Sequence, residues 1–372
     1  MRRKIYSMEQ EEALGVLLRA ESLTVAGTLE DGSPALRVVH GIVTEGWVAF
    51  HGASAGEKLE LLGRPVVISA HEIIAQIPST FFDPERACPA TTYYLSAQVE
   101  GVLEEVVDVG EKAALLQALM ERYQPEGGYV PITADDPLYA KMVRGIMLAR
   151  VSLDGLCGKK KVGQNRTPAQ LAGLMGSLWR RGKPGDVAAI EALRQANPSA
   201  EVPAFLVGPE GVSLIAELDG ARIEEAAELV ASGYWNAWTT PEAVLKALSC
   251  SQVRVGAVDA EGRLIAAARA TTDGARRAWI YDVMVTPDWR GRGVGEALMR
   301  LVLDHPLVRE VETVMLATKD AMSFYERLGF VDARTIQARP WISTQMILVR
   351  GGIWRPEASE GGGQSASVAA LT

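Results

Sequence analysis

A glycine-rich turn lies between a strand-like run and a helical run, and its spacing suits the binding of a phosphate. The strand-like run covers residues 279–285, the turn covers residues 290–295, and an amphipathic pattern begins at Glu296. Glycines let main-chain N–H groups approach a phosphate closely, and a helix N-terminus adds a partial positive charge. Arg290 and Arg292 can add charge-assisted contacts. The pattern predicts a pyrophosphate-binding turn, and an ordinary strand-to-helix turn is the alternative from these residues alone.

A short aromatic helix is predicted further along the chain. Residues 311–317 read as a strand, and residues 320–330 read as a helix with Asp320 near its N-cap and Gly329 directly after its end. Tyr325 lies inside this helix, and a phenol beside a leaving group can act as a general acid. Packing against a sheet is the alternative role for Tyr325.

Together the two segments resemble the acetyl-CoA-binding core of the GNAT N-acetyltransferases. The resemblance rests on an Arg-x-x-Gly-x-Gly turn at residues 290–295 and a Phe-Tyr-x-x-x-Gly-Phe segment at residues 324–330, and it extends over residues 203–350. It implies that main-chain groups of Val283 and Val285 hold the pantetheine arm and the acetyl group, while the turn holds the pyrophosphate. The implied acetyl-CoA contacts are Val283, Met284, Val285, Arg290, Gly291, Arg292, Gly293, Val294 and Gly295.

The same resemblance implies the catalytic groups. Tyr325 would protonate the departing thiolate. The attacking amine must also lose a proton, either to a base or to a water relay. Asp282 is the nearest carboxylate on the strand, with Asp273 behind it, and a structural hydrogen-bond acceptor is the alternative role for either. Residues 318–320 are Thr-Lys-Asp where many relatives carry an asparagine, so a coenzyme contact at that point is left open.

Length and composition fit two soluble globular domains. The chain has 372 residues, of which 48% are hydrophobic and 23% charged, and this length is too great for one ordinary core. The net charge of -8 argues against a surface that coats nucleic acid. Cys88, Cys157 and Cys250 lie far apart, which argues against a disulfide framework and a metal site. No signal peptide or membrane-spanning run is recognised, so a cytoplasmic setting is expected.

The first half of the chain alternates short strand-like runs with turn signals. A capping-box pattern at Ser7 predicts a helix to about Ala20, and a second helix is predicted at residues 108–123. An antiparallel barrel is the economical fold for such short strands. The strand-like runs are residues 23–29, 35–43, 47–51, 65–71, 93–106 and 146–156.

One turn of this barrel can also bind a phosphate. A strand that ends at His51 leads into small residues, and a helix is expected with Lys58 in its first turn. Ser54, main-chain N–H groups and Lys58 could contact the phosphate. Residues 34–71 resemble the FMN-binding split barrels of the pyridoxamine 5′-phosphate oxidase superfamily, and residues 93–101 match the next strand of that pattern.

The segment after the barrel resembles the FMN-binding negative-regulator branch of that superfamily. There a Lys-x-x-Gln-Asn-Arg run, here residues 161–166, precedes a helical tail. Lysines 159–161 are interpreted as a solvated basic turn rather than a DNA contact. Helices are predicted after Thr167 as far as Gly182, and over residues 186–196. The domain boundary is therefore placed near residue 200.

The barrel resemblance implies a flavin site and a homodimer. In this superfamily the flavin usually lies at a dimer interface, so dimerisation through the barrel follows from the resemblance. A solvated helix residue is the alternative role for Lys58, and histidines with satisfied hydrogen bonds in the sheet are the alternative for His40 and His51. The implied FMN contacts are Arg37, His40, His51, Ser54, Lys58, Ser96, Gln164 and Asn165.

Two further histidines and the C-terminal tail are assigned no chemistry. His71 ends an apolar strand, and His305 ends the helix after the glycine turn, where a cationic side chain would favour the helix dipole. Residues 356–372 are too poor in apolar side chains to order themselves, which predicts a flexible tail.

The sequence therefore predicts an α+β chain of two domains. Residues 1–200 form an antiparallel split β-barrel with flanking helices, which include a helical extension at about 167–197, and residues 201–355 form a GNAT mixed α/β domain. The predicted activity is transfer of acetyl from acetyl-CoA to a small-molecule amine, with FMN bound in the barrel. One alternative is a flavin-responsive regulator or binding protein whose acetyltransferase fold does not turn over. Another is an FMN-dependent oxidoreductase whose second domain only binds coenzyme A. No residue fixes the acceptor amine.

Overall fold

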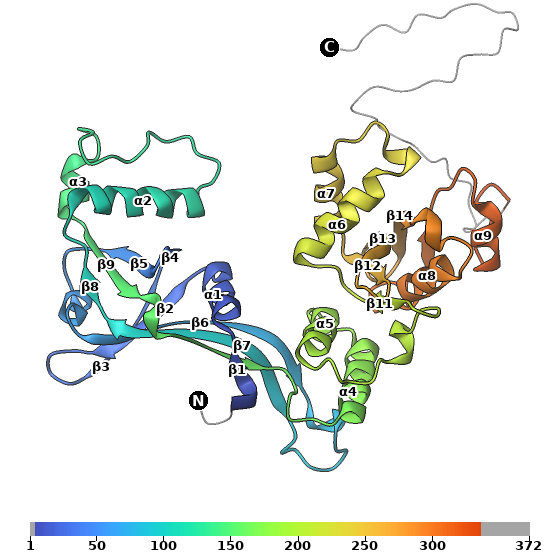
Figure 1. Cartoon of the computed structure of the whole chain (residues 1–372), viewed down its shortest axis with the longest axis horizontal. Helices are drawn as coiled ribbons and strands as arrows, with labels where there is room; N and C mark the ends of the chain where they lie inside the picture. Colours follow the sequence, from blue (N-terminus) through green and yellow to red (C-terminus); the bar gives the residue numbers. More distant parts are fainter. Residues whose placement is uncertain (1–3, 336–372) are drawn as a thin grey trace, which may run out of the picture. The chain divides into compact units, whose positions relative to one another are not determined.

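Two compact units make up the chain, Met1–Ala317 and Thr318–Thr372. The structure is a computed structural model that describes residues 4–335 (Figure 1). The predicted end of the second domain at residue 355 and the predicted tail at residues 356–372 lie outside the described residues. The first unit holds the three sheets of the described chain.

The N-terminal part of the first unit consists of two antiparallel sheets. The strand order is β1-β10-β7-β6-β2-β3 in the six-stranded sheet and β4-β5-β9-β8 in the four-stranded sheet. Side chains of both sheets share one hydrophobic cluster, which holds Ile68 and Val99 together with Phe50 and Val151. The predicted antiparallel split barrel is confirmed. Its strands are β1 (Ser7–Met8), β2 (Leu23–Thr28), β3 (Pro34–Val39), β4 (Gly41–Thr44), β5 (Trp47–Gly52), β6 (Pro65–Ile77), β7 (Thr91–Val102), β8 (Glu104–Glu105), β9 (Met147–Ser152) and β10 (Leu156–Lys161).

A change of sheet explains why residues 35–43 do not form one strand. β3 ends at Val39 and β4 begins at Gly41, and the two strands belong to different sheets. A Cβ at Gly41 would lie 2.7 Å from the Leu23 side chain, so a larger residue would collide there. Glycine therefore permits the crossing that follows His40. The predicted run at residues 93–106 divides between the two sheets in the same way, into β7 and β8.

The first helix is not capped by Ser7. Main-chain pairing with β10 holds Ser7 in strand β1, opposite Lys159. Helix α1 (Gln10–Arg19) begins after Glu9, whose side chain makes no capping hydrogen bond. The predicted capping box is wrong, because the hydroxyl that would cap the helix belongs to a residue already paired in a sheet.

Lysines 159–161 do not form a solvated turn. They lie in strand β10, which pairs with β7 on one side and β1 on the other. Lys160 Nζ forms an ion pair with Glu12 at 2.5 Å, and Lys161 Nζ donates to the Thr91 hydroxyl at 2.5 Å. The prediction is wrong because helix α1 and strand β7 supply partners that local charge density does not reveal.

Helix α2 (Val109–Tyr123), which the sequence predicted, covers the four-stranded sheet. Asp108 caps its N-terminus, and its side chain Leu116 lies in one cluster with Leu148 of β9. The short helix α3 (Ala140–Gly145) contacts α2 and leads into β9.

Two helices follow the barrel, α4 (Pro168–Arg181) and α5 (Asp186–Ala196). Thr167 forms the predicted capping box at the start of α4, and Gly182 ends the helix with a φ of 62°. The sequence predicted both helices because their start and stop signals are local.

These two helices contact elements on both sides of them in the first unit. Arg181 Nη1 donates to the main-chain oxygen of Gln76 in β6 at 2.8 Å. Trp179 Nε1 donates to Asp304 Oδ2 at 2.7 Å, at the far end of helix α8 (Val294–Asp304). The α4–α5 pair therefore packs on the end of the barrel and on the sheet that follows it.

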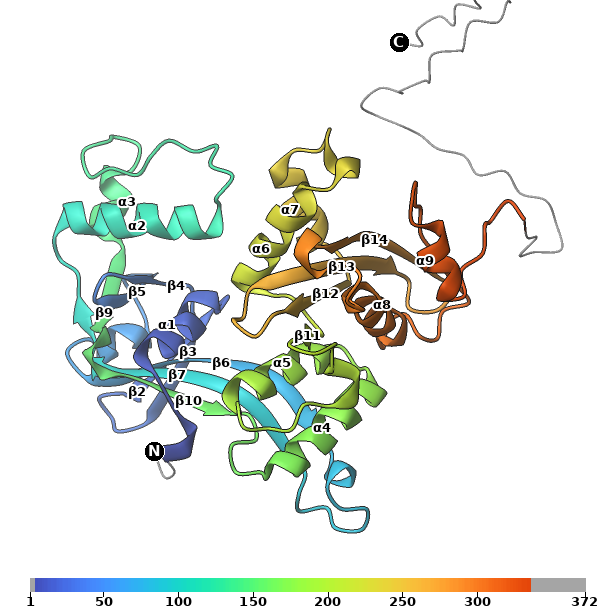
Figure 2. The same ribbon diagram turned by 45° about the vertical axis from the view of Figure 1, so that its right-hand side comes forward.

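A five-stranded mixed sheet forms the C-terminal part of the first unit. Its order is β11-β12-β13-β14-β15, and its neighbours are antiparallel except for the parallel pair β14 and β15. Helices α6 and α7 pack on Ala267 and Met284, and α8 contacts β12, β13 and β14 (Figure 2). The predicted mixed α/β domain is confirmed. Its elements are β11 (Ser213–Ile215), α6 (Gly220–Ala231), α7 (Pro241–Ser249), β12 (Val253–Val258), β13 (Leu264–Thr272), β14 (Arg277–Val285), α8 and β15 (Thr313–Met315).

His305 is buried and neutral rather than a cation at a helix end. It is the C-cap of α8, its residue is 3% exposed, and its Nδ1 accepts a hydrogen bond from the N–H of Leu307 at 3.2 Å. Burial, with a smaller effect of the nearby Arg309 charge, lowers the pKa of His305 to about 4. The predicted favourable charge at the helix end is wrong, because desolvation outweighs the attraction of the helix dipole.

The buried imidazole makes stability depend on pH. Between pH 6.5 and about pH 4 the unfolded chain binds a proton on His305 that the folded chain does not bind, so stability falls as the pH is lowered. We expect this residue to remove about 3 kcal/mol of unfolding free energy between pH 7 and pH 4. Urea unfolding followed by tryptophan fluorescence measures the loss. The His305→Asn variant should lose about 3 kcal/mol less over the same range, and equal pH slopes for the two proteins would contradict the assignment.

The described part of the second unit holds helix α9 (Met322–Arg327). The N–H of Ala321, the N-cap residue, donates to the Thr318 hydroxyl at 3.1 Å, and Asp320 directly precedes this N-cap, as predicted. Gly329 follows the C-cap with a φ of 89°, as predicted.

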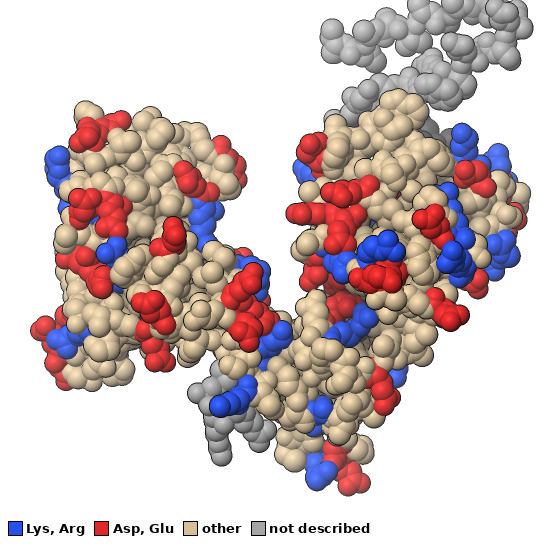
Figure 3. All heavy atoms as spheres, in the orientation of Figure 1, with Lys and Arg blue, Asp and Glu red and all other residues tan. Residues whose placement is uncertain are grey.

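Charges of both signs cover the face of the first unit that Figure 3 shows, where acidic and basic side chains are interspersed. No helix within residues 4–335 combines the length and the apolar character needed to cross a bilayer. In the same residues no group of three or more His, Cys, Asp or Glu side chains is arranged to hold a metal ion, and the three cysteines are free and exposed.

Candidate functional site

Strand β14 pairs with β15 over only part of its length. Residues 277–279 pair with residues 313–315, and within the described chain residues 280–285 have no partner strand on that side. The N–H of Thr286 donates to the carbonyl of Ile265 at 2.9 Å, which directs Thr286 toward β13. Because successive residues of a strand face opposite edges, the main chains of Val283 and Val285 face the open edge. This edge can bind an extended, amide-containing ligand.

A β-bulge interrupts β14 within this edge. Pairing with β13 slips between Ala267 and Arg269, and Asp282 lies in the interruption with a φ of 55°. The carboxylate of Asp282 accepts hydrogen bonds from Arg269 Nε and from Trp235 Nε1, the second at 2.9 Å. The first candidate base is therefore already engaged by two donors.

Asp273, the second candidate base, shapes the turn between β13 and β14. Its Oδ1 accepts hydrogen bonds from the N–H groups of Arg277, Ala275 and Arg276 at 2.9, 3.0 and 2.7 Å. These hydrogen bonds lower the pKa of Asp273 to about 2. A carboxylate stabilised in this way is a weak base, so Asp273 is a structural residue.

The turn between β14 and α8 has the backbone that a phosphate site needs. Gly291 and Gly293 are exposed and have φ values of 72° and 80°, which side chains disfavour. Gly293 is the N-cap of α8 and offers no side-chain cap, so the first N–H groups of the helix are available to an anion. Arg290 Nε donates to the carbonyl of Val285 at 3.1 Å, which ties the turn to the open edge.

The other residues of the turn have distinct surroundings. The guanidinium of Arg292 lies 5.1 Å from the ring centre of Trp289, and the Arg292 residue is exposed. The side chain of Val294 is buried and that of the next residue, Gly295, is a hydrogen, so both can contact a ligand only through the main chain.

Tyr325 lies on α9 of the second unit, where its ring packs among other aromatic rings. The ring centres of Phe324 and Phe330 lie 5.0 and 5.9 Å from that of Tyr325, both at steep angles. The N–H of Phe330 donates to the carbonyl of Tyr325 at 3.1 Å. The local sequence therefore fixes the ring of Tyr325 within its own unit.

Five of the predicted flavin contacts lie around the end of β5. Lys58 is in a 3₁₀ turn, Glu57–Leu61, rather than an α-helix, and its Nζ lies over Gly52 of β5. Ser54 donates its hydroxyl to the carbonyl of Gly145. Arg37 forms an ion pair with Glu57.

His40 and His51 complete this group. Desolvation, together with the charges of Lys58 and His40, lowers the pKa of His51. The ring of His40 lies 5.3 Å from that of Tyr123. Within residues 4–335 no carboxylate forms an ion pair with Lys58, so its ammonium group can neutralise a bound phosphate.

Of the remaining predicted flavin contacts, one lies in the six-stranded sheet and two lie in the turn that follows β10. Ser96 is in the middle of β7. The amide of Gln164 accepts from the N–H of Val162 at 2.9 Å and donates to the carbonyl of Lys160 at 2.8 Å, which closes the turn after β10. Asn165, the next residue, is exposed. The Gln164 amide thus holds the turn after β10, and the assignment of these three residues to a flavin stays a prediction.

The partners of Asp282 were not predicted, although the sequence carries a signal for one of them. Arg269 is the one charged residue in the apolar run at residues 264–270, and a charge in a buried strand requires a partner. Its side chain is 14% exposed. Trp235 has no comparable signal, because its contact with β14 depends on the packing of α6.

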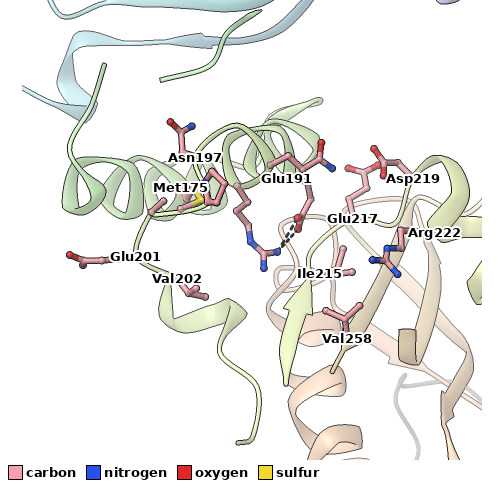
Figure 4. A pocket seen from close by; sticks show the side chains of 14 residues that line it. Met175, Glu191, Asn197, Glu201, Val202, Ile215, Glu217, Asp219, Arg222 and Val258 are labelled. Atoms are coloured by element: carbon pink, nitrogen blue, oxygen red, sulfur yellow. Dashed lines mark hydrogen bonds and ion pairs between the residues drawn. The ribbon is translucent and has the colours of Figure 1, made fainter. Parts of the chain in front are cut away.

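A cavity of about 350 Å³ lies between α5, β11 and the start of α6 (Figure 4). Its walls carry ion pairs that are already formed, Glu191 with Arg194 at 2.9 Å and Glu217 with Arg254 at 2.6 Å. Burial raises the pKa of Glu191 and of Glu217. None of the predicted site residues lines this cavity, and β12 and β13 separate β11 from β14 in the sheet.

Two family models match different parts of the chain. The model described as pyridoxamine 5′-phosphate oxidase matches residues 9–160, and the model of the acetyltransferase (GNAT) family matches residues 222–330. The helices α4 and α5 lie in the interval between the two matches.

Individual relatives cover one part of the chain each. An uncharacterised N-acetyltransferase, ycf52, of Porphyra purpurea is 39% identical over 74 residues, which make up 20% of this chain and 42% of that protein. The chain spans less than half the length of the curated relatives it matches. A solved structure from Xanthomonas campestris pv. campestris, described as belonging to the GNAT family, is 30% identical and covers 36% of this chain and 94% of its own, with a TM-score of 0.31. The flavocytochrome Anf3 of Azotobacter vinelandii is 20% identical and covers 42% of this chain and 68% of its own, with a TM-score of 0.36.

Proposed function

Because residues 9–160 belong to a pyridoxamine 5′-phosphate oxidase-like family and residues 222–330 to the GNAT family, we propose that the chain is an acetyl-CoA-dependent N-acetyltransferase fused to a flavin-binding module. One observation carries the proposal. The open edge at Val283 and Val285 runs directly into a glycine turn whose backbone suits a pyrophosphate. An extended arm that ends in a diphosphate is the shape of coenzyme A.

Acetyl-CoA would bind along these two elements in order. The N–H groups at Gly293, Val294 and Gly295 would receive the pyrophosphate at the start of α8, with Arg292 free to approach it. The main chains of Val283 and Val285 would pair with the pantetheine arm as a strand does, with the side chain of Met284 turned into the core. This pairing would hold the thioester carbon where an amine can reach it.

The reaction is a direct acyl transfer. The lone pair of a neutral amine forms the new C–N bond to the thioester carbon, the C–S bond breaks, and the sulfur leaves with its electron pair. Tyr325 would give its phenolic proton to that sulfur, which the resemblance of residues 324–330 supports. The amine loses one proton, and because both oxygens of Asp282 accept hydrogen bonds, we assign its removal to a water relay.

Thiol release in the presence of an amine panel tests the proposed function. Purified full-length protein is mixed with acetyl-CoA and with primary amines of different charge and size, and free coenzyme A is measured with a thiol reagent. We expect at least one amine to raise thiol release above the rate with water alone. If acetyl-CoA binds and every amine fails, the regulator with a silent acetyltransferase fold is favoured. If acetyl-CoA does not bind, the proposal is wrong.

For the barrel we propose FMN as the bound flavin. The cluster around Lys58, Ser54 and His51 fits a phosphate, because the Lys58 ammonium group has no carboxylate partner within the described chain. A bound flavin would supply hydride or electron transfer. If the bound flavin turns over with a reductant, the FMN-dependent oxidoreductase alternative gains support.

Removal of the Lys58 charge should weaken FMN binding. The Lys58→Met variant is expected to bind FMN about 10- to 100-fold more weakly, because a charge-assisted hydrogen bond to the phosphate is lost. Quenching of FMN fluorescence during a titration measures the affinity. Lys246→Met, which changes an exposed lysine of α7, serves as the control and should bind FMN as the wild type does. Equal affinities for the two variants would exclude Lys58 from the site.

We also propose that the barrel forms a homodimer. Leu36 and Val38 on edge strand β3 are 63% and 70% exposed, and a second copy of the chain would cover them. Sedimentation equilibrium of the full-length chain tests this, and a monomer at micromolar concentration would contradict it.

A further inference from the structure

The carboxylate of Asp282 accepts hydrogen bonds from two different elements of the fold. The residue belongs to β14, at the bulge within the open edge. One oxygen, Oδ2, accepts from Arg269 of β13, and the other, Oδ1, accepts from Trp235 of the connection between α6 and α7. The side chain of Asp282 is 9% exposed, so its carboxylate is largely shielded from bulk water, whereas Trp235 is 38% exposed.

The Arg269 side of this arrangement is anchored in the sheet. Arg269 is 14% exposed, its Nη1 donates to the Ser251 hydroxyl at 3.2 Å, and its guanidinium carbon lies 4.4 Å from the ring centre of Tyr281. An ion pair that is largely shielded from water and has additional hydrogen bonds favours one geometry. Breaking that geometry would leave a charge without a partner. Arg269 therefore fixes the carboxylate against the sheet.

The Trp235 side is anchored in the α6–α7 connection. Trp235 lies in a 3₁₀ turn, Tyr234–Asn236, and its ring packs edge-on against that of Tyr234 at 5.0 Å. A Cβ at Gly233 would lie 2.7 Å from the indole, so glycine is required for the ring to take this position. The indole N–H thus reaches Asp282 from an element that flanks the open edge of β14.

A positive φ at a residue that is not glycine needs such support. The left-handed conformation costs an aspartate about 1 kcal/mol or more. It persists only where contacts with the surrounding residues hold the backbone in place. The bulge it produces sets the direction in which the main chain of Val283 leaves β13.

We propose that Asp282, Arg269 and Trp235 form a clamp that positions the main chain of Val283 for the acetyl end of the coenzyme. This inference rests on the proposed function. It makes Asp282 a positioning residue that does not exchange a proton with the amine, and it links the α6–α7 connection to the strand that holds the thioester.

The affinities for two ligands distinguish a clamp at the acetyl end from a general role of Asp282 in folding. Acetyl-CoA contacts both the strand edge and the glycine turn, whereas 3′-phospho-ADP, the nucleotide half of the coenzyme, contacts only the turn. Asp282→Ala should weaken acetyl-CoA binding about tenfold and leave the affinity for 3′-phospho-ADP within about twofold of the wild type. Calorimetric titration of the full-length protein measures both constants.

Two milder variants keep the test independent of misfolding. Trp235→Phe removes one donor and leaves the ion pair intact, and we expect about a threefold loss for acetyl-CoA alone. Trp238→Phe, on the same connection but 91% exposed, is the matched control and should bind both ligands as the wild type does. Asp282→Asn tolerates the positive φ and keeps one hydrogen bond, so it should recover most of the affinity and of the thiol release lost in Asp282→Ala.

Four results would overturn the clamp. Equal losses for acetyl-CoA and 3′-phospho-ADP in Asp282→Ala would show a structural role only. If Asp282→Asn bound acetyl-CoA normally and released no thiol, Asp282 would be the base. No selective loss in either Asp282→Ala or Trp235→Phe would remove the inference while leaving the proposed function in place. A wild-type protein that bound 3′-phospho-ADP but not acetyl-CoA would refute both.

Discussion

The Gly293→Glu variant should lose acetyl-CoA binding by at least about a hundredfold in Kd, which corresponds to about 2.8 kcal/mol. Gly293 has a φ of 80° at the N-cap of α8, next to the N–H groups that would hold the pyrophosphate. A glutamate there would fill the space and place a negative charge where the ligand carries its own. The rise in melting temperature on addition of acetyl-CoA measures the effect, and it should disappear.

A second glycine separates this effect from backbone strain. Gly262, in the turn between β12 and β13, also has a φ of 80°, and a Cβ there would meet open space. Gly262→Glu carries the same conformational cost of about 1 kcal/mol and should keep the full thermal shift. If both variants respond to acetyl-CoA as the wild type does, the glycine turn does not bind the diphosphate.

Tyr325→Phe should lower kcat about a hundredfold and leave KM for acetyl-CoA within about twofold. The substitution removes only the phenolic oxygen, and the phenylalanine ring can keep the contacts with Phe324 and Phe330. Without a proton donor the sulfur would leave as a thiolate. Steady-state thiol release with the best amine from the panel measures kcat and KM separately.

The control is Tyr281 of β14, which supports Arg269 through its ring and whose hydroxyl has no proposed role. Tyr281 contacts Arg269 and Trp279 through its ring, so Tyr281→Phe should keep kcat near the wild-type value. A Tyr325→Phe enzyme with more than about a third of the wild-type kcat would assign the proton donor to another group or to water.

Local patterns predicted the glycine turn and the helices around it. Residues 290–295 needed no information beyond their own spacing, because the positive φ of Gly291 and Gly293 follows from residue type. The same holds for α4, whose Thr167 capping box and terminal Gly182 formed as predicted. Elements with strong start and stop signals are determined over a few residues, and the sequence is sufficient for them.

Predictions failed where an element distant in the sequence supplied the partner. Ser7 reads as a helix cap, but it pairs with β10 more than a hundred residues later. Lysines 159–161 read as a solvated turn, but Glu12 and Thr91 lie beside them. His305 reads as a surface cation, but the ring of Trp179 from α4 packs against it at 5.4 Å and helps to bury it. No local pattern contains these contacts, because tertiary packing creates them.

The sequence identified candidate site residues, but it did not reveal the hydrogen bonds that engage their side chains. Asp282 was identified as the nearest carboxylate on the strand that would hold the thioester. Its two hydrogen-bond donors were not foreseen, since one of them comes from a connection between helices. Gln164 stays a predicted flavin contact, and its amide also closes a turn, which the sequence did not predict. A sequence shows which groups are present, whereas their availability depends on neighbours that only the fold brings together.

The packing of α4 and α5 determines where the chain can be cut. A truncated protein that began at residue 201 would lack Trp179, whose indole donates to Asp304, and Glu191, which accepts the N–H of Ala216 at 2.7 Å. It would expose the apolar end of α8 and the edge of the last sheet to water, and poor solubility would follow. Both helices should therefore be retained when the acetyltransferase half is produced by itself, with the cleavage point ahead of Thr167.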